Sequence, residues 1–369
     1  MSWDGAGLLI VGDQLEVFGG QERVLEALLR RYPAAELVAL RFRRSPRDEG
    51  RRLRGAEHAR GLRVPGKRHP LLTPLYAGRM ALAPSPRADV VLSLTQGGSS
   101  VGARTRGATR HVTYSSGPPT IYGQSELVLL DERPVLRPFI RAAVPALRAC
   151  HVRLMRRPDR VIANSHYSAR HMESMYGVMA EVLHPPVRAD FFTPSPRERR
   201  HWLAVGRLTS QKRFDVLVAA FAKLDAQLVV AGTGAAVDRL RASAPGNVSF
   251  VGFADDETLR ELYRSARGLI SPSLETFGLV IAEALACGTP VIAQRAGGAV
   301  ELVREGLNGV FLEGAEPDAV IRAVESLERL APDPQACRAA IESYSEERFF
   351  ARIDRVLEAE RALAQGSRR

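Results

Sequence analysis

The chain has 369 residues, of which 45% are hydrophobic and 25% are charged, and this composition favours a soluble globular protein with two domains. No apolar run approaches the roughly 20 residues that a membrane-spanning helix needs, and the start lacks the basic region of a secretory signal. We therefore expect a cytoplasmic protein. Cys150, Cys287 and Cys337 lack the paired spacing of metal ligands, so we expect structural thiols and no metal site.

The formal net charge of +11 is unevenly distributed. Residues 1–195 hold 29 Lys and Arg against 17 Asp and Glu, a balance of +12, whereas residues 196–369 hold 23 against 24, a balance of −1. Residues 41–68 alone contain 11 basic and 3 acidic side chains. This stretch is either a solvated arginine-rich loop or a surface that attracts an anionic membrane or an acidic acceptor. Nucleic acid is not expected, because no nucleic-acid-binding signature accompanies it.

Residues 1–195 alternate short apolar runs with amphipathic segments, which predicts βα units on a mostly parallel sheet. The expected strands are residues 7–12, 88–95, 159–165 and 180–187. The expected helices are residues 19–32 and 167–177.

A Pro-rich polar stretch at residues 190–200 is expected to be a linker, after which the alternation starts again. The expected strands there are residues 201–208, 226–234, 247–253 and 268–273, and the expected helices are 214–224 and 256–266. The sequence therefore predicts an α/β fold of two doubly wound domains. They cover residues 1–195 and 196–345, and residues 346–369 are expected to form a C-terminal helix and tail that pack back toward the first domain.

Glu275 and Glu283 lie in an otherwise apolar stretch, residues 274–293. The pattern predicts a strand that ends before Glu275, a turn, and a helix over residues 277–287. At about 1.5 Å per residue the two carboxylates lie roughly 12 Å apart, close to the span from the sugar to the ribose of a nucleotide sugar. Two alternatives stay open: Glu275 is only a favourable anion near a helix start, and Glu283 is only a solvated helix position.

The loops around this helix offer groups that bind a diphosphate. The backbone N–H groups of Phe277, Gly278 and Leu279 can receive one, and Gly278 leaves room for close backbone approach. After the strand at residues 201–208, Arg207 and Lys212 supply two cations beside Gly206. Lys212 is one of only three lysines among 52 basic residues, which hints that a compact ammonium is needed; an ordinary exposed loop lysine is the alternative.

Three further motifs have simpler interpretations. Gly232 and Gly234 lack the third small residue of a dinucleotide-binding fingerprint, so we expect them to shape a turn. The acids at residues 255–257 are expected to stabilise a helix start. Gly19 and Gly20 follow the first strand, and they either turn the chain or let the loop approach a substrate.

The motifs "GGQERV", "VIANSHYSARHM", "EVLHPPVRADFF", "VGRLTSQKRFDVLVAAF", "VVAGTG", "LETFGLVIAEALACGTPVIA" and "AGGAVELV" occur in this order along nearly the whole chain. Together they resemble family 4 of the glycosyltransferases, and in particular its mannosyltransferase-like members. The resemblance implies the GT-B fold, in which two Rossmann-like domains face each other across a cleft. It also implies that the second domain holds a nucleotide-sugar donor, that the first presents the acceptor, and that the anomeric configuration is retained without a metal ion or other cofactor.

The resemblance also implies roles for individual residues. Arg207 and Lys212 would bind the diphosphate, Glu275 the sugar hydroxyls and Glu283 the ribose hydroxyls, which makes Glu275, Arg207 and Lys212 the expected catalytic set. The backbone would contribute at the sugar, the phosphates and the base, and two glycines of the first domain would close on the donor. These expected donor-binding positions are Gly19, Gly20, Gly206, Gly252, Phe253, Thr276, Phe277, Gly278 and Leu279.

One segment departs from the family pattern. In "HVTYSSGPPTIYG", residues 111–123, Ser116 stands where mannosyltransferase-like members carry a histidine that faces the donor sugar, and Gly123 follows Tyr122. Tyr114 and Ser116 are the expected sugar- or acceptor-facing residues here. His111 lies five residues before Ser116 and would point to the opposite face of a strand, so we do not expect it to compensate.

The sequence thus predicts a retaining, metal-independent hexosyltransferase, with GDP-mannose favoured over a UDP-sugar. Its acceptor is expected to be lipid-linked, a polysaccharide or a natural product, and its basic first domain offers peripheral contact with the inner face of the cell membrane. Such an enzyme would serve cell-envelope or exopolysaccharide biosynthesis. The alternatives are a catalytically silent nucleotide-sugar-binding or scaffold protein and a sugar-nucleotide epimerase of the same fold.

Overall fold

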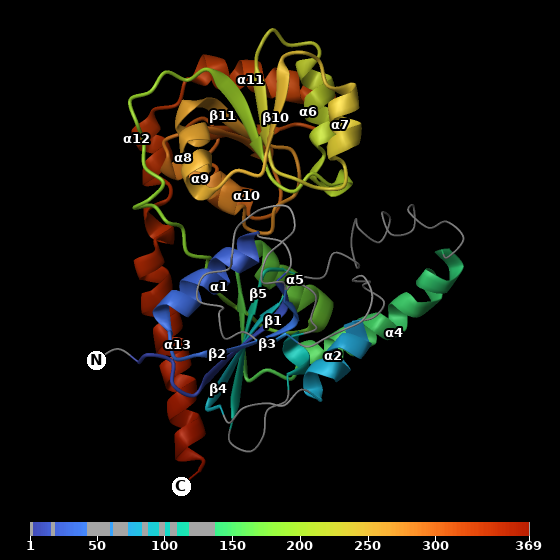
Figure 1. Ribbon diagram of the computed structural model, residues 1–369, viewed down its shortest axis with the longest axis vertical. Coiled ribbons are helices and arrows are strands. Elements are labelled where there is room, and N and C mark those ends of the chain that lie inside the picture. Colours follow the sequence, from blue (N-terminus) through green and yellow to red (C-terminus); the bar gives the residue numbers. More distant parts are fainter. Residues whose placement is uncertain are drawn as a thin grey trace. The chain divides into compact units, whose positions relative to one another are not determined.

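The computed structural model describes residues 3–15, 19–42, 60–61, 73–82, 88–95, 100–103, 109–117 and 137–368. The chain divides into two compact units (Figure 1). Unit 1 comprises Met1–His184 and Phe349–Arg369, and unit 2 comprises Pro185–Arg348. Each unit has its own parallel sheet and hydrophobic core.

The sheet of unit 1 has seven parallel strands in the order β3-β2-β1-β4-β5-β6-β7. Their bounds are β1 Leu8–Leu15, β2 Glu36–Phe42, β3 Arg60–Gly61, β4 Val90–Thr95, β5 Arg110–Ser115, β6 Arg160–Ala163 and β7 Glu181–Val182. The order reverses between β1 and β4, as in doubly wound folds. Successive residues of β1 face opposite sides of the sheet: Leu8 and Ile10 belong to one core cluster, and Leu9 and Val11 belong to another.

The helices of unit 1 cover both faces of this sheet (Figure 1). They are α1 Gly20–Arg31, α2 Thr73–Ala81, α4 Arg137–Met155, α5 His166–Tyr176 and α13 Glu346–Gly366, with a short 3₁₀ turn, η2, at Ser100–Gly102. Local signals set the ends of α5, because the Ser165 hydroxyl accepts from the Ser168 N–H and Gly177 ends the helix with φ 61°.

The C-terminal helix α13 packs on unit 1 from Phe349 onward. Ile353 and Leu357 are buried in the same core cluster as β1 and α1. Asp354 accepts hydrogen bonds from Arg31 and from the Tyr32 hydroxyl. Burial and the neighbouring carboxylate raise the pKa of Tyr32 far above its usual range. This last segment of the chain therefore completes the core of the first.

The sheet of unit 2 has six parallel strands in the order β10-β9-β8-β11-β12-β13. Their bounds are β8 His201–Val205, β9 Leu228–Ala231, β10 Val248–Gly252, β11 Ala266–Ser271, β12 Val291–Gln294 and β13 Gly309–Leu312. Here the order reverses between β8 and β11. Leu203 faces one core cluster and Trp202 the other, so both faces of the sheet are covered.

Helices flank the sheet of unit 2 on both faces (Figure 1). They are α6 Phe214–Phe221, α7 Val237–Ser243, α8 Asp256–Ser265, α9 Leu279–Ala286, α10 Ala299–Leu302, α11 Pro317–Leu330 and α12 Pro334–Ala339, with 3₁₀ turns η5 Ser210–Lys212 and η6 Glu342–Tyr344. The acids at the start of α8 act as expected, since the Asp255 carboxylate accepts from the Thr258 N–H at 2.8 Å.

The stretch that the sequence predicts to be a linker is bound to unit 2. Arg338 donates to the carbonyls of Ala189 and Phe192 at 3.0 and 3.2 Å, and Arg264 donates to the carbonyl of Thr193 at 2.7 Å. Phe192 is fully buried. The compact units therefore divide between His184 and Pro185, whereas the Pro-rich composition predicts a boundary at residues 195/196.

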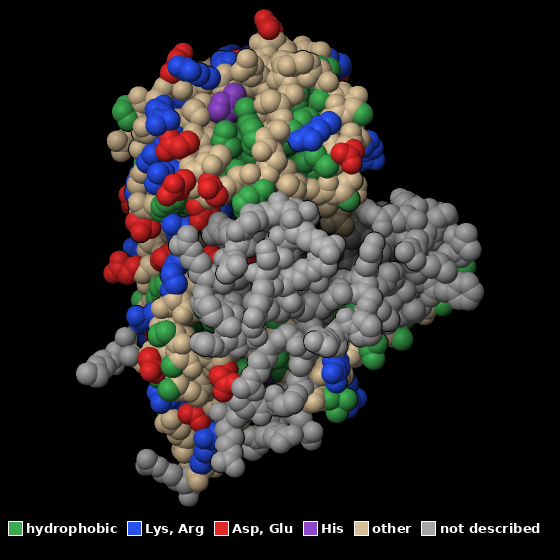
Figure 2. Space-filling model, in the orientation of Figure 1, with side chains coloured by type: hydrophobic (Ala, Val, Ile, Leu, Met, Phe, Trp, Pro, Cys, Tyr) green, Lys and Arg blue, Asp and Glu red, His purple; other side chains and the backbone are tan. Residues whose placement is uncertain are grey.

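The basic stretch at residues 41–68 lies mostly outside the described residues, which include only Arg41, Phe42 and β3 from it. On the face that Figure 2 shows, basic and acidic side chains are interspersed among the described residues. No helix in the described part of the chain is both long enough and apolar enough to cross a membrane.

Candidate functional site

The candidate site lies in unit 2, where the order of the strands reverses. β8 and β11 are neighbours in the sheet, so the loops after their carboxyl ends meet. The loop after β8 carries Gly206, Arg207 and Lys212, and the loop after β11 carries Glu275. Ligands of open parallel sheets bind at such a reversal of strand order.

The structure brings Lys212 and Glu275 together. The Lys212 ammonium forms an ion pair and hydrogen bond with Oε1 of Glu275. The Ser273 hydroxyl donates to the same oxygen at 3.3 Å. The side chains of the pair are 25% and 18% exposed, so the two charges are partly shielded from water and their attraction is stronger than at an open surface.

Arg207 supplies a second positive charge on the loop after β8. Its side chain is exposed, and its guanidinium makes no hydrogen bond or ion pair with the residues that the structure describes. An exposed guanidinium and a partly buried ammonium that follow the same strand are suited to binding an anion with two phosphates.

The start of α9 adds backbone donors to this region. Gly278 precedes the helix with φ 99°, a conformation that side-chain-bearing residues rarely adopt. The helix begins at Leu279, two residues later than the sequence pattern predicts. The first N–H groups of an α-helix have no acceptor within the helix and attract anions. Thr276 is half-buried, whereas the Phe277 ring packs on Tyr344 with ring centroids 5.6 Å apart, so only the backbone of Phe277 remains for a ligand.

Gly297 and Gly298, for which the motif alone predicts no individual role, hold the Glu275 loop. The Gly298 N–H donates to the Glu275 carbonyl at 2.7 Å. A Cβ at Gly298 would lie 2.3 Å from Cα of Phe277, and one at Gly297 would lie 2.1 Å from the Glu275 carbonyl oxygen. The signal for them was a glycine pair in the loop after β12, at the same edge of the sheet.

The glycines after β9 hold the other loop in the same way. A Cβ at Gly232 would lie 1.9 Å from the carbonyl oxygen of Gly206, and one at Gly234 would lie 2.3 Å from that of Leu208. The Leu208 N–H donates to the Thr233 carbonyl at 2.8 Å. Gly232 and Gly234 thus bring two backbones together, in agreement with the turn that we expected from them.

Glu283 is buried on α9, with only 3% of the residue exposed. Its Oε2 accepts a hydrogen bond from the Tyr263 hydroxyl at 3.0 Å. Ile281, Ala282 and Ala284 beside it are fully buried. The alternative of a solvated helix position is therefore wrong.

Gly252 and Phe253 lie at the carboxyl end of β10, the edge strand of the same sheet. Gly252 has φ 73° and its carbonyl accepts from the Gly232 N–H at 2.7 Å. Both residues are half-buried, as is Leu279 on α9. Their expected contacts with a base or phosphate stay predictions.

In unit 1, Tyr114 does not lie where its predicted role requires. Tyr114 is 3% exposed, its hydroxyl donates to the Leu183 carbonyl at 3.1 Å, and its ring packs edge-on against Phe349. This placement contradicts the expectation that Tyr114 faces a sugar or acceptor. Successive side chains of a strand point to opposite faces of the sheet, and Tyr114 lies on the face of β5 that packs into the core.

The other predicted residues of unit 1 lie at the ends of elements. Ser116 is half-buried just after β5, and its N–H donates to the Thr95 carbonyl at 2.9 Å. Gly19 precedes α1 with an extended φ of −156°, and Gly20 is its exposed first residue. Their ligand contacts stay predictions, and Tyr122 and Gly123 lie outside the described residues.

His111 belongs to a buried polar cluster and not to the site. Its Nε2 lies 2.9 Å from the Ser93 hydroxyl oxygen, which lies 2.8 Å from that of Thr113. Burial lowers the pKa of His111 to about 4. The side chain is therefore neutral at pH 7.

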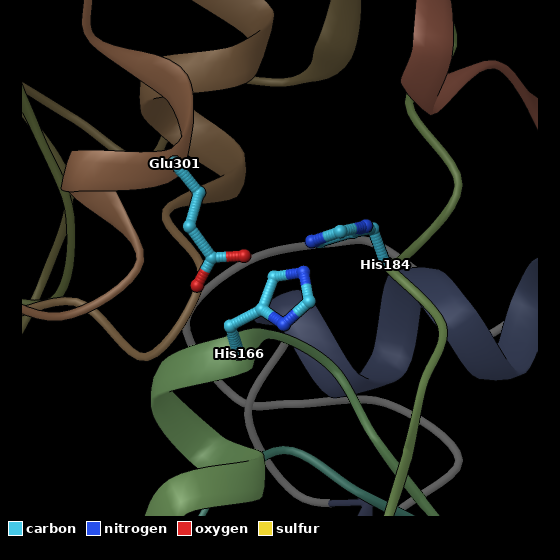
Figure 3. A group of neighbouring side chains, drawn as sticks. All are labelled: His166, His184 and Glu301. Atoms are coloured by element: carbon cyan, nitrogen blue, oxygen red, sulfur yellow. The ribbon is translucent and has the colours of Figure 1, made fainter.

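Unit 1 also contains a histidine pair that carried no prediction. His166 begins α5, His184 follows β7, and their ring centroids lie 5.8 Å apart (Figure 3). The third residue that Figure 3 labels, Glu301, belongs to α10 of unit 2. The two imidazoles that unit 1 itself provides are fewer than the three protein ligands of a typical catalytic zinc site.

Comparisons with known proteins agree with this arrangement. The family model described as "Glycosyl transferases group 1" matches residues 188–348. An uncharacterized glycosyltransferase of Methanocaldococcus jannaschii is 38% identical in an alignment of 133 residues that covers 33% of this chain and 34% of that protein. D-inositol 3-phosphate glycosyltransferase 1 of Catenulispora acidiphila is 30% identical in an alignment of 295 residues that covers 70% of each chain. The chain thus spans only a third of one relative's length and about two thirds of the other's.

Solved structures share the fold over nearly the whole chain. HepE of Anabaena, determined in complex with UDP and glucose, has a TM-score of 0.72 at 20% identity and covers 95% of this chain and 99% of its own. Sucrose-phosphate synthase of Thermosynechococcus elongatus has a TM-score of 0.74 at 18% identity, with 96% and 99% coverage. The two doubly wound sheets, the match in unit 2 and the relative that aligns over 70% of both chains lead to one conclusion: this chain belongs to the group 1 glycosyltransferases and has the GT-B fold.

Proposed function

We propose that this protein is a retaining, metal-independent glycosyltransferase that moves a hexosyl group from a nucleotide sugar to an acceptor, with GDP-mannose favoured and a UDP-sugar as the alternative donor. The observation that carries the proposal is the contact between Lys212 and Glu275 at the reversal of the strand order, beside the start of α9. This arrangement offers a cation for phosphate, a carboxylate for sugar hydroxyls and backbone amides within one pair of loops.

The charges fit the chemistry of transfer. Breaking the bond between the sugar and the diphosphate leaves negative charge on the diphosphate and positive character on the sugar ring. Arg207, Lys212 and the first amides of α9 would stabilise the leaving diphosphate, as fixed cations and dipoles do in other active sites. They supply the positive charge that a metal ion supplies in other transferases. Because Lys212 already contacts Glu275, a diphosphate that binds Lys212 would also lie close to the carboxylate that positions the sugar.

The carboxylates bear on the route by which the configuration would be retained. Retaining glycosidases employ two carboxyl groups about 5–5.5 Å apart, one of them as a nucleophile. Here Glu275 is paired with Lys212, and Glu283 is buried and bound to Tyr263. We therefore propose that the leaving phosphate oxygen takes the acceptor's proton while the acceptor oxygen bonds to the sugar on the same face.

Two observations support an anionic acceptor. The balance of +12 in residues 1–195 attracts anions. The Catenulispora acidiphila relative is named for D-inositol 3-phosphate, an anionic small molecule. A lipid-linked acceptor at an anionic membrane, a polysaccharide and a natural product are the other candidates, and the same charge supports peripheral contact with such a membrane.

Donor binding is the first experiment. Calorimetry with a panel of GDP- and UDP-sugars compares the wild type with Lys212→Met and with Lys223→Met. Lys223 is the matched control, because it is a lysine of the same unit whose ammonium pairs with the exposed Asp318, at 2.9 Å, and not with Glu275. We expect one donor to bind, Lys212→Met to weaken it at least tenfold and the control to bind normally. A folded wild type that binds no donor would refute the proposal.

Turnover tests the reaction itself. The selected donor is incubated with D-inositol 3-phosphate and with lipid-linked, polysaccharide and natural-product acceptors, with and without a chelator, and NMR reads the anomeric configuration. A product with the donor's configuration, formed equally with the chelator, supports the proposal. An inverted product would contradict the retaining mechanism. Activity that the chelator abolishes would contradict the independence of a metal ion.

The second candidate function is a silent nucleotide-sugar-binding or scaffold protein. Ser116 favours it, since a serine replaces the histidine typical of mannosyltransferase-like members. Donor binding without turnover on any acceptor would support this candidate. Turnover with a single acceptor would exclude it, and a changed sugar without any acceptor would indicate an epimerase.

Sedimentation with liposomes tests the membrane contact. Binding to vesicles that contain anionic lipid, reduced by salt and absent with neutral vesicles, is the expected result. Equal binding to neutral vesicles, or no binding, would contradict it.

A further inference from the structure

Tyr263 lies on α8 and has no exposed surface. Its hydroxyl contacts the carboxylate of Glu283. The hydroxyl oxygen lies 3.0 Å from Oε2 of Glu283 on α9. The two residues are 0% and 3% exposed. α8 and α9 lie side by side in unit 2, so neighbouring helices supply the donor and the acceptor (Figure 1).

The position of the Tyr263 hydroxyl is fixed by its surroundings. The ring packs against that of Phe192 with centroids 5.9 Å apart at 73°. The Thr289 hydroxyl donates to the backbone carbonyl of Tyr263 at 2.6 Å. A side chain held at its ring and at its backbone presents its hydroxyl in one direction, so Glu283 receives a rigid donor.

A buried carboxylate needs such a donor for two reasons. Burial of a charge without hydrogen bonds is unfavourable, and the residues beside Glu283 on α9 are apolar. A carboxylate is also free to rotate about its terminal bond unless a partner holds one oxygen. The bond from Tyr263 holds Oε2 and thereby sets the plane in which the carboxylate meets any other group.

We propose that Tyr263 is a positioning residue that orients Glu283 toward the ribose hydroxyls of the donor. The inference rests on the proposed function, because it needs a nucleotide to be bound beside α9. Tyr263 itself does not touch the nucleotide. It acts through Glu283, so its removal should affect recognition of the ribose hydroxyls and leave the phosphates and the base unaffected.

The experiment measures the preference for the ribose hydroxyls. Calorimetry gives the dissociation constants of UDP and of its analogue without both ribose hydroxyls, and likewise for the GDP pair. The proteins are the wild type, Tyr263→Phe and Tyr344→Phe. Tyr344→Phe is the matched control, since it removes the same atom from the other tyrosine of unit 2, whose hydroxyl bonds to the Glu301 carbonyl at 3.0 Å.

We expect the wild type and Tyr344→Phe to prefer the hydroxyl-bearing nucleotide by about tenfold or more. Tyr263→Phe should bind that nucleotide about tenfold more weakly and bind the analogue unchanged, so that the preference disappears. As a second variant, Thr289→Val loosens the Tyr263 backbone and is expected to lower the preference by roughly threefold.

Each other outcome has a definite meaning. If Tyr263→Phe weakens both nucleotides equally, or keeps the preference, then Tyr263 only stabilises the fold and the inference is wrong. If Tyr263→Phe does not fold, Thr289→Val decides instead: an equal loss for both nucleotides, or an unchanged preference, would show that the inference is wrong. If the wild type binds both nucleotides equally, Glu283 does not contact the ribose and the inference fails while nucleotide binding stands. If the folded wild type binds neither, the proposed function fails with it.

Discussion

Gly298 shows how a residue without a functional group can control the candidate site. Its N–H donates to the Glu275 carbonyl, and its lack of a side chain lets the backbone of Phe277 approach. The Glu275 carboxylate is positioned by this loop, so the glycine acts on the site through the backbone.

Gly298→Ala should therefore disturb the site. The new Cβ would lie 2.3 Å from Cα of Phe277, a distance that only a backbone shift relieves. We expect a loss of about 1–3 kcal/mol in the free energy of unfolding and a donor affinity at least tenfold lower. Urea unfolding and calorimetry measure the two effects. Gly246→Ala is the control, because a Cβ there meets nothing within 4 Å; equal effects of both changes would contradict this account.

The burial of His111 makes the stability of the fold depend on pH. Its pKa is about 4 in the folded chain because it is buried, whereas an exposed histidine has a pKa of about 6.5. Between these values the unfolded chain binds a proton that the folded chain does not. The contribution of His111 to the free energy of unfolding is therefore fully present above about pH 6.5. It is lost as the pH falls toward 4, and the total loss is about 3 kcal/mol.

Urea unfolding at several pH values between 7 and 4 tests this, with His111→Gln as the comparison. The wild type should lose more stability than the variant over this range. Parallel pH profiles of the two proteins would show that His111 is not the group responsible.

Among the elements, the predicted linker at residues 190–200 shows how composition and packing can conflict. Its prolines and polar residues are typical of a linker, yet Phe192 is fully buried and Arg338 donates to the carbonyls of Ala189, Phe192 and Ala286. One guanidinium on α12 thus replaces the hydrogen bonds that a strand or helix would have supplied.

Arg338→Met keeps the aliphatic stem and removes these three bonds. We expect the free energy of unfolding to fall by about 2–4 kcal/mol and residues 185–200 to become sensitive to proteases. Urea unfolding and limited proteolysis with mass spectrometry provide the measurements. Arg329→Met on the exposed side of α11 is the control and should change neither. Unchanged proteolysis of Arg338→Met would show that the burial of Phe192 and the bond from Arg264 to Thr193 hold the segment without Arg338.

For the whole molecule, the two units differ in how the chain builds them. Unit 2 is one continuous segment, Pro185–Arg348, with its own core on both faces of the sheet. Unit 1 needs Phe349–Arg369 from the far end of the chain, and Phe349, Ile353 and Leu357 are buried in its core.

Expression of the units separately tests this difference. Residues 185–348 alone should fold, show a cooperative urea transition and bind the selected donor's nucleoside diphosphate. Residues 1–184 alone should lack a cooperative transition, because the missing helix leaves apolar surface of the sheet and of α1 in water. A cooperative transition of residues 1–184 would contradict the assigned role of α13.

The sequence by itself determined the fold class and the region of the candidate site. Two runs of alternating apolar and amphipathic segments predicted two doubly wound sheets, because helical and strand periodicities are local properties. The positions of Arg207, Lys212 and Glu275 after strands placed them at one edge of a parallel sheet, for the same reason.

Only the tertiary structure decided which side chains meet. The contact of Lys212 with Glu275, the bond from Tyr263 to Glu283 and the approach of Gly298 to Phe277 join residues that are 20 or more positions apart. Tyr114 looked like a ligand-facing residue in its motif, but strand alternation and Phe349 of the last helix put it in the core. Such contacts depend on packing between elements, and local periodicity does not predict that packing.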